Sequence, residues 1–126
     1  MRVKLGTVGH FGLAVRNPRK SATWWMKHFD LEKIFGGKDY VGLSDDAVTI
    51  VLHEGVPHPG VFGHMSFHLE SIDALHAALE ALREGGVKLE DLGDEIGPEA
   101  PGSKNMGLWF RDPDGYRWEL SVLARA

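Results

Sequence analysis

Apolar residues recur with two alternating spacings along this chain. Over residues 7–15, large apolar residues alternate with small or polar ones, which is typical of a half-buried strand. Up to about Phe29, apolar residues then recur every three or four positions, which predicts a helix. Asn17 is its expected N-cap and Pro18 its first helical residue. Three shorter segments, residues 31–35, 40–43 and 47–53, then predict strands. The first half therefore predicts the element order βαβββ.

The second half of the chain repeats this order. Residues 63–69 predict a strand, and Ser71 is placed to cap a helix that ends at Gly85 and Gly86. The expected buried stripe of that helix comprises Ile72, Leu75, Leu79 and Leu82. A weak strand and a closing hairpin are predicted at residues 87–90, 106–111 and 116–123. The expected fold class is α+β, with βαβββ modules at about residues 5–54 and 62–124 in a single domain spanning residues 1–126.

The repeat extends to individual residues. Residues 9–15 line up with residues 63–69, which places His10 and His64 at equivalent positions, 54 residues apart. In each strand the histidine lies on the face opposite the large apolar residues. If those apolar faces pack on the helices, a pseudo-twofold relation between the modules brings the two imidazoles close together.

A carboxylate stands in an otherwise apolar strand near the C-terminus. Pro113 and Gly115 predict a tight turn, after which Trp118 and Leu120 alternate with the charged Glu119. By the same facing argument, Glu119 points to the side of the sheet that carries His10 and His64. Taken singly, each histidine is more often a hydrogen-bonded structural residue than a ligand.

Taken together, the two imidazoles and the carboxylate are a ligand set for one divalent metal ion with open positions. Fe(II), Mn(II), Zn(II), Ni(II) and Co(II) are all compatible with these ligand types.

Composition narrows the classes of function. The 126 residues carry a net charge of −4 and no basic stripe, which argues against a nucleic acid partner. The absence of cysteine excludes disulfides, thiolate metal sites and a cysteine nucleophile. No apolar segment approaches 18 residues, so no membrane span is predicted. The first residues are too few and too polar for a signal peptide, and we expect a cytoplasmic protein.

The residues assembled so far resemble the vicinal oxygen chelate superfamily, which includes glyoxalase I, fosfomycin-resistance enzymes, extradiol dioxygenases and bleomycin-resistance proteins. The matching features are the Gly-His pair that opens each module and the Asp-Pro-Asp-Gly hairpin leading to Glu119. The resemblance implies two sheets that form an open barrel-like cleft around one metal ion, with His10, His64 and Glu119 as its ligands. It also implies a small-molecule substrate and a homodimer.

The chain departs from the best-known members of that family. Matching the last strand of module one puts Ile50 where glyoxalase I carries a fourth ligand. No histidine or tyrosine lies between Gly93 and Phe110, where extradiol enzymes carry catalytic residues, and Trp109 replaces a tyrosine of fosfomycin enzymes. The leading hypothesis is therefore a metal-dependent lyase, dioxygenase or transferase with an unassigned small substrate. The metal ion would act as a Lewis acid towards chelating oxygens.

Further site residues follow from this hypothesis. Glu119, His68 and Arg117 are the candidate catalytic residues, with His68 and Arg117 serving proton transfer or anion pairing. A substrate pocket is expected to be lined by Tyr40, Ile50, Leu52 and Trp109. The Gly- and Pro-rich segment 91–104 is a candidate lid. Ordinary packing for Trp109 and a solvated position for Arg117 are equally compatible with the sequence.

The rival hypothesis is a metal-free protein of the bleomycin-resistance type that binds and sequesters a small drug or aromatic compound. The negative net charge would suit a cationic ligand, and four tryptophans are available for stacking. Such a protein does not need the two histidines and the glutamate. No feature of the sequence supports a purely structural or interaction module.

Overall fold

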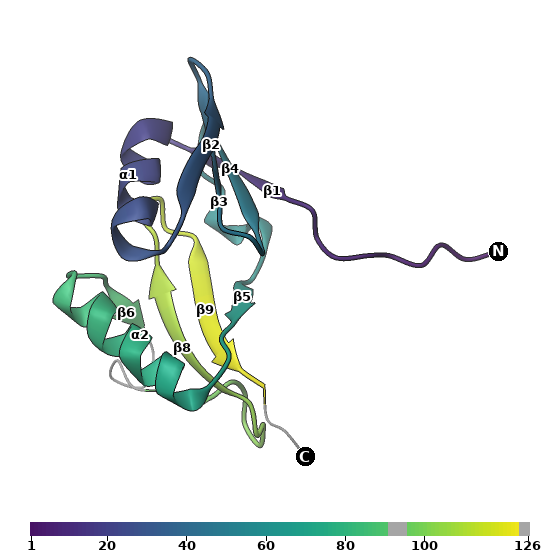
Figure 1. Ribbon diagram of the computed structural model, residues 1–126, viewed down its shortest axis with the longest axis vertical. Helices are drawn as coiled ribbons and strands as arrows, with labels where there is room; N and C mark the ends of the chain where they lie inside the picture. Colours follow the sequence, from purple (N-terminus) through teal and green to yellow (C-terminus); the bar gives the residue numbers. More distant parts are fainter. Residues whose placement is uncertain (91–95, 124–126) are drawn as a thin grey trace. The chain divides into compact units, whose positions relative to one another are not determined.

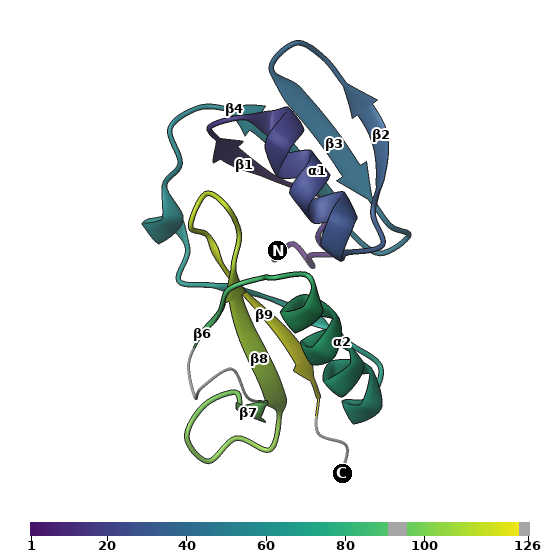
Figure 2. The same ribbon diagram turned by 90° about the vertical axis from the view of Figure 1, so that its left-hand side faces the viewer.

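The computed structural model describes residues 1–90 and 96–123, and the chain divides into two units. Unit 1 spans residues 1–57 and unit 2 spans residues 58–126. Each unit contains one principal helix and its own mixed sheet (Figures 1 and 2). The division falls in the segment 53–61 that its prolines and glycines identify as a linker.

Unit 1 has the predicted order βαβββ. Its elements are β1 (Phe11–Val15), α1 (Pro18–His28), β2 (Glu32–Gly36), β3 (Tyr40–Ser44) and β4 (Thr49–Glu54). The strands form a sheet in the order β1-β4-β3-β2, in which β1 is parallel to β4 and the other neighbours are antiparallel.

The core of unit 1 lies between α1 and one face of this sheet. The Asn17 side chain caps α1 by accepting a hydrogen bond of 3.1 Å from the Lys20 backbone N–H. The helix buries Ala22 and Trp25 and contacts β3 and β4. The buried strand residues are Leu13, Val15, Val41, Leu43, Ile50 and Leu52. Their alternation along the strands is the pattern expected for one covered face.

Unit 2 repeats the order with two additions. Its elements are η1 (Pro59–Val61), β5 (Met65–His68), α2 (Ile72–Glu84), β6 (Leu89–Glu90), β7 (Gly97–Pro98), β8 (Met106–Arg111) and β9 (Arg117–Val122). The sheet order β5-β9-β8-β6 matches that of unit 1, and β5 is parallel to β9 as β1 is to β4. The short strand β7 pairs with β8.

The core of unit 2 lies between α2 and the sheet. Ser71 caps α2 by accepting a 3.1 Å hydrogen bond from the Ala74 backbone N–H. Helix α2 contacts β8 and β9. The buried residues are Leu75, Leu79 and Leu82 on the helix and Leu108, Phe110, Trp118 and Leu120 on the strands. The α+β class and the repeated module are confirmed.

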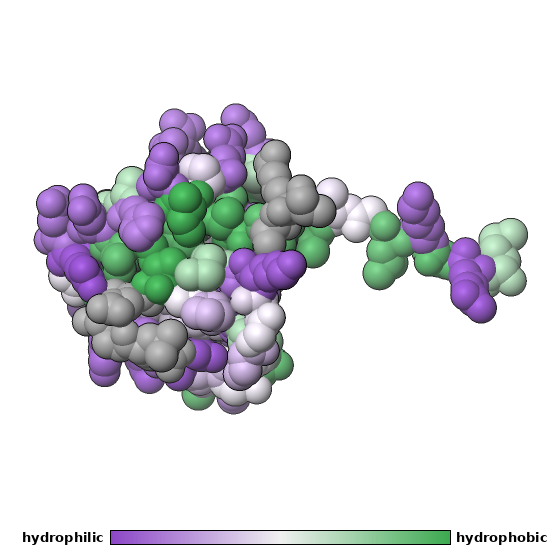
Figure 3. All heavy atoms as spheres, turned by 90° about the horizontal axis from the view of Figure 1, so that it is seen from below, coloured by the Kyte–Doolittle hydropathy of each residue, from purple (hydrophilic) through white to green (hydrophobic). Residues whose placement is uncertain are grey.

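Two local expectations about the elements need correction. Ile72 was expected in the buried stripe of α2, but it is the first residue of the helix and is 42% exposed. The first strand starts at Phe11, and residues 1–10 are exposed. Figure 3 shows polar and apolar residues mixed along this extended N-terminal segment.

The long segment 91–104 also differs from expectation. It contains β7, so part of it is paired with the sheet. Residues 91–95 of the expected lid lie outside the described residues. Among the residues that the structure describes, no helix is both long and apolar enough to cross a membrane.

Candidate functional site

Strand β9 carries a polar face on the side of the sheet away from α2. Because Trp118 and Leu120 belong to the helix-side core, Arg117, Glu119 and Ser121 lie on the opposite face. The strand register places Ser66 of β5 and Trp109 of β8 on either side of Glu119. The next row of cross-strand neighbours, two residues further along β9, comprises His68, Ser121 and Gly107. The site is therefore built from three adjacent strands of unit 2.

Glu119 is the most unusual residue of this face. Its side chain is only 1% exposed, and its Oε2 atom has no hydrogen-bond partner. Burial raises the pKa of Glu119 above its ordinary value, and the nearby charge of Glu99 raises it further. A hydrogen bond from Ser66 acts in the opposite direction. A buried carboxylate oxygen without a donor is unfavourable for folding, so it needs a functional or structural explanation.

Gly107 makes room for this carboxylate. A Cβ atom at position 107 would lie 2.6 Å from Oε2 of Glu119, a separation that real Cβ atoms essentially never show. Ser121, the cross-strand neighbour of Gly107, shares a 2.7 Å hydrogen bond with Ser66. The carboxylate therefore sits in a cradle formed by a glycine and two small hydroxyl residues.

Trp109 forms an aromatic platform beside Glu119. The His64 ring lies edge-on to it with 4.8 Å between ring centroids, and the Arg117 guanidinium lies 4.0 Å from the Trp109 ring centre. Arg117 also donates from Nε to Glu90 at 3.0 Å, and Glu90 accepts a second hydrogen bond from Arg111. Burial would raise the pKa of Glu90, but the two arginines outweigh it and lower the pKa.

The hairpin before β9 is held by a second buried carboxylate. Asp112 accepts hydrogen bonds from the backbone N–H groups of Asp114 (2.9 Å) and Tyr116 (3.1 Å) on Oδ1 and from the Trp118 indole (3.0 Å) on Oδ2. Gly115 adopts a φ of +90°, which favours glycine. Burial raises the pKa of Asp112 to about 6, although these three donors oppose the shift. The turn thus fixes which face Glu119 occupies.

The predicted histidines lie on both units. His64 and His68 are exposed residues of unit 2, and His68 pairs with Ser121 in the row next to Glu119. His10 is exposed in unit 1, directly before β1. Within residues 1–90 and 96–123, no three histidine, aspartate or glutamate side chains are grouped closely enough to hold a metal ion. The three-residue ligand set therefore stays a prediction.

Two residues of unit 1 that were expected to line a substrate pocket, Ile50 and Leu52, lie in the core instead. Ile50 and Leu52 are 1% and 0% exposed on the helix side of the sheet, so this placement does not support a role for them in lining a pocket. The register pairs Gly12 with Val51, as Ser66 pairs with Glu119. Val51, rather than Ile50, is therefore the equivalent of Glu119. The aliphatic side chains of Val51 and Ile50 cannot bind a metal ion.

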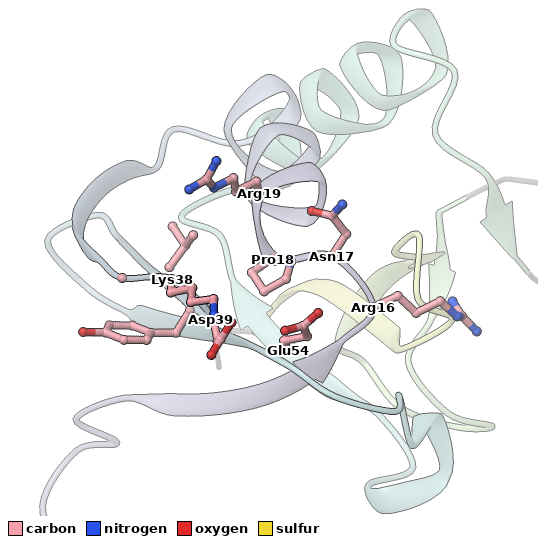
Figure 4. Close-up of a pocket in the computed structure, with 10 residues that line it drawn as sticks. Arg16, Asn17, Pro18, Arg19, Lys38, Asp39 and Glu54 are labelled. Atoms are coloured by element: carbon pink, nitrogen blue, oxygen red, sulfur yellow. The ribbon is translucent and has the colours of Figure 1, made fainter.

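Tyr40 does line a pocket, of about 280 Å³, at the start of α1 (Figure 4). The charged residues around it are Arg16, Arg19, Lys38, Asp39 and Glu54. Cations and carboxylates of similar number face this pocket, so it favours neither anions nor cations. The helix N-terminus that borders it is already capped by Asn17.

Sequence reasoning missed Asp112, Gly107 and Glu99 as parts of this site. The Asp-Pro-Asp-Gly turn was a signal for Asp112, but nothing in the pattern showed that its carboxylate is buried. Gly107 and Glu99 carry no signal in a single sequence, because their importance depends on what lies across the strand.

Comparisons with known proteins give one matching family model and several relatives. The sequence model of the Glyoxalase/Bleomycin resistance protein/Dioxygenase superfamily matches residues 7–120. A trivalent organoarsenical cleaving enzyme of Bacillus sp. (strain MD1) is 30% identical over 115 residues, covering 88% of this chain and 70% of that protein. The cadmium-induced protein CadI of Mycobacterium tuberculosis is 27% identical over 115 residues, covering 89% and 74%.

Solved structures show the same fold. The fosfomycin resistance protein FosX of Listeria monocytogenes matches with a TM-score of 0.76 and 19% identity, covering 96% of each chain. At this level of identity the likeness concerns the fold alone.

Proposed function

The chain belongs to the Glyoxalase/Bleomycin resistance protein/Dioxygenase superfamily, and on that premise we propose that it is a metal-dependent enzyme acting on a small substrate with chelating oxygens. In this proposal, His10, His64 and Glu119 hold one divalent metal ion. The ion, when bound, supplies Lewis-acid stabilisation of an oxyanion that develops on the substrate.

The observation that carries the proposal is the buried, unpartnered Oε2 atom of Glu119. Burying a carboxylate oxygen without a hydrogen-bond donor is unfavourable, and a cation removes that penalty. The Gly107 cradle keeps the space around Oε2 free of side-chain carbon. The exposed imidazole of His64, held edge-on by Trp109, adds a nitrogen ligand of the type that suits Zn, Fe and Ni.

The chain's own residues would orient the substrate. Trp109 presents an aromatic surface against which a planar or apolar part of the substrate can pack. Arg117 is a weaker candidate for binding an anion than the sequence implied, because its guanidinium already pairs with Glu90 and stacks on Trp109. His68 is the better candidate for accepting or returning a proton, since it is exposed on the same face in the row next to Glu119.

The relatives narrow the choice of substrates to test. One is named for cleaving trivalent organoarsenicals, and the other is named as induced by cadmium. An activity screen therefore starts with organoarsenicals and continues with catechols, α-ketoaldehyde hemithioacetals and epoxides. Any thiol that takes part has to come from a cosubstrate, because this chain contains no cysteine.

Metal content of untagged protein, followed by calorimetric titration with Mn(II), Co(II) and Zn(II), tests the proposal. We expect near-stoichiometric binding by the wild type and none by Glu119→Gln. Glu80→Gln, an exposed carboxylate on α2, serves as the matched control and should bind like the wild type. A wild-type protein that neither retains nor takes up metal would overturn the proposal and favour the metal-free binding protein instead.

A further inference from the structure

A second carboxylate is brought to Glu119 from the long segment before β8. Strand β7 pairs with β8 so that Gly97 lies opposite Gly107, the residue that cradles the Glu119 carboxylate (Figure 2). Glu99 follows directly after β7, and its backbone N–H donates a 2.9 Å hydrogen bond to the carbonyl of Asn105. This backbone pairing holds Glu99 next to β8.

The Glu99 side chain is itself positioned. It is half-buried, and its Oε1 atom accepts a hydrogen bond of 3.5 Å from the Asn105 side-chain amide. Its negative charge is close enough to Glu119 to help raise the pKa of that carboxyl group. Since Gly97 lies opposite Gly107, the Glu99 side chain is near the place where one oxygen of Glu119 is buried and has no partner.

Two carboxylates in contact repel each other, more strongly when water is excluded. A protein can hold them together if they share a proton or if they share a cation. The positive charge of Arg117 lowers the pKa of Glu119 but does not outweigh burial and the charge of Glu99. Its guanidinium is engaged by Glu90 and Trp109. The neutralising charge is therefore not fully supplied by this arginine.

We propose that Glu99 is a second carboxylate ligand for the divalent cation held by Glu119. This inference rests on the proposed function, because it assigns a further ligand to the same centre. In unit 1, the cross-strand neighbours at the position equivalent to Glu119 are Gly12, Val51 and Gly42. None of these residues can bind a metal ion through its side chain. In this proposal, Glu99 provides an oxygen ligand that the equivalent residues of unit 1 do not provide. A second carboxylate adds a hard oxygen ligand, in the sense of hard and soft Lewis bases. Such a ligand set favours Mn(II) or Fe(II) over ions that prefer sulfur ligands.

The test compares Glu99→Gln with the wild type, with Glu84→Gln on the exposed side of α2 as the matched control. Glutamine keeps the oxygen that accepts from Asn105, so the loop is expected to stay folded. Far-UV circular dichroism and urea unfolding check this. Calorimetry with Mn(II) should show affinity reduced roughly tenfold or more for Glu99→Gln and unchanged for Glu84→Gln.

The visible absorption of Co(II)-loaded protein gives a readout that a purely structural role would not move. At saturating Co(II), loss of one oxygen ligand should change the band positions or intensities in Glu99→Gln. Glu99→Asp, which keeps the charge but shortens the side chain, should give an intermediate affinity.

The outcomes separate the two proposals. Wild-type binding with an unchanged affinity and spectrum in Glu99→Gln overturns the role of Glu99 and leaves the proposed function intact. Absence of metal binding in the wild type overturns both proposals.

Discussion

The two sheets of this protein have the same topology but opposite chemistry on the face away from the helix. In unit 1 the central row of that face is Gly12, Val51 and Gly42, and in unit 2 it is Ser66, Glu119 and Trp109. The Phe35 ring covers Gly42, whereas the Glu119 carboxylate covers Gly107 on the corresponding third strand. The repeated module therefore duplicates the scaffold and leaves each face free to acquire its own chemistry.

The turns before the last strand of each sheet show the same contrast. In unit 1, Asp45 accepts from the backbone N–H groups of Ala47 and Val48 at 2.7 and 2.8 Å, and it is exposed. In unit 2, Asp112 accepts from three donors, including the Trp118 indole, and it is 6% exposed. The same residue type makes a solvated turn in one sheet and a buried anchor in the other.

Removing the two turn carboxylates should give the largest difference in stability between the two units. Asp112→Ala leaves three donors without an acceptor and is expected to lower the free energy of unfolding by about 3 kcal/mol at pH 5. Asp45→Ala should cost about 1 kcal/mol, because water replaces its hydrogen bonds. Urea unfolding at pH 5 measures both, and equal losses would show that burial of Asp112 does not matter.

The second largest difference is expected for replacement of two glycines, Gly107 on β8 and Gly42 on β3. Gly107→Ala forces the buried Glu119 carboxylate to move and is expected to cost about 2 kcal/mol and to weaken metal binding. In Gly42→Ala the obstacle is the Phe35 ring, which is 42% exposed and can swing aside. That change should stay within about 0.5 kcal/mol. Urea unfolding and Mn(II) calorimetry of the two variants test the difference, and a tolerated Gly107→Ala would argue against the cradle.

The pH dependence of the metal-free protein should reflect unit 2. The pKa of Asp112 is raised from 3.8 to about 6, so its protonated form favours the folded state. The resulting stability is fully present below pH 3.8 and is lost as the pH rises through about 6. The raised pKa of Glu119 acts in the same direction. Unfolding midpoints measured with chelator should fall over this range, and less steeply in Asp112→Asn. A midpoint that rises with pH would contradict the assignment.

The smallest effect is expected for the charged residue that flanks Glu119. Arg117→Met removes the contact with Trp109 and the hydrogen bond to Glu90, and should cost roughly 1 kcal/mol because the pair is partly solvated. The equivalent position in unit 1 is Thr49, whose hydroxyl shares a 2.9 Å hydrogen bond with Ser44. Thr49→Ala should have a similarly small effect. Thermal unfolding measures both, and a loss above about 3 kcal/mol for Arg117→Met would mean that the pair supports the core.

Much of the fold could be predicted because its signals are local. The caps of Asn17 and Ser71 and the stripes of α1 and α2 lie within short windows of sequence. The two-residue strand β7 could not be predicted, since it is too short for periodicity and depends on pairing with β8. The wall residues Ile50 and Leu52 followed from the metal-enzyme hypothesis, although their own alternation with Val51 already puts them on the apolar, helix-facing side.

Local sequence patterns were enough to establish the repeated βαβββ order, the turn that contains Gly115, and the position of one carboxylate on an apolar strand. Those features depend on residues close together in the chain, where backbone preference and periodicity act directly. Folding is what buries Glu119 with one oxygen lacking a donor, leaves room for it at Gly107, and brings the charge of Glu99 near it. These contacts cross strands and a long loop, so desolvation and repulsion between the carboxylates arise only when the chain is folded.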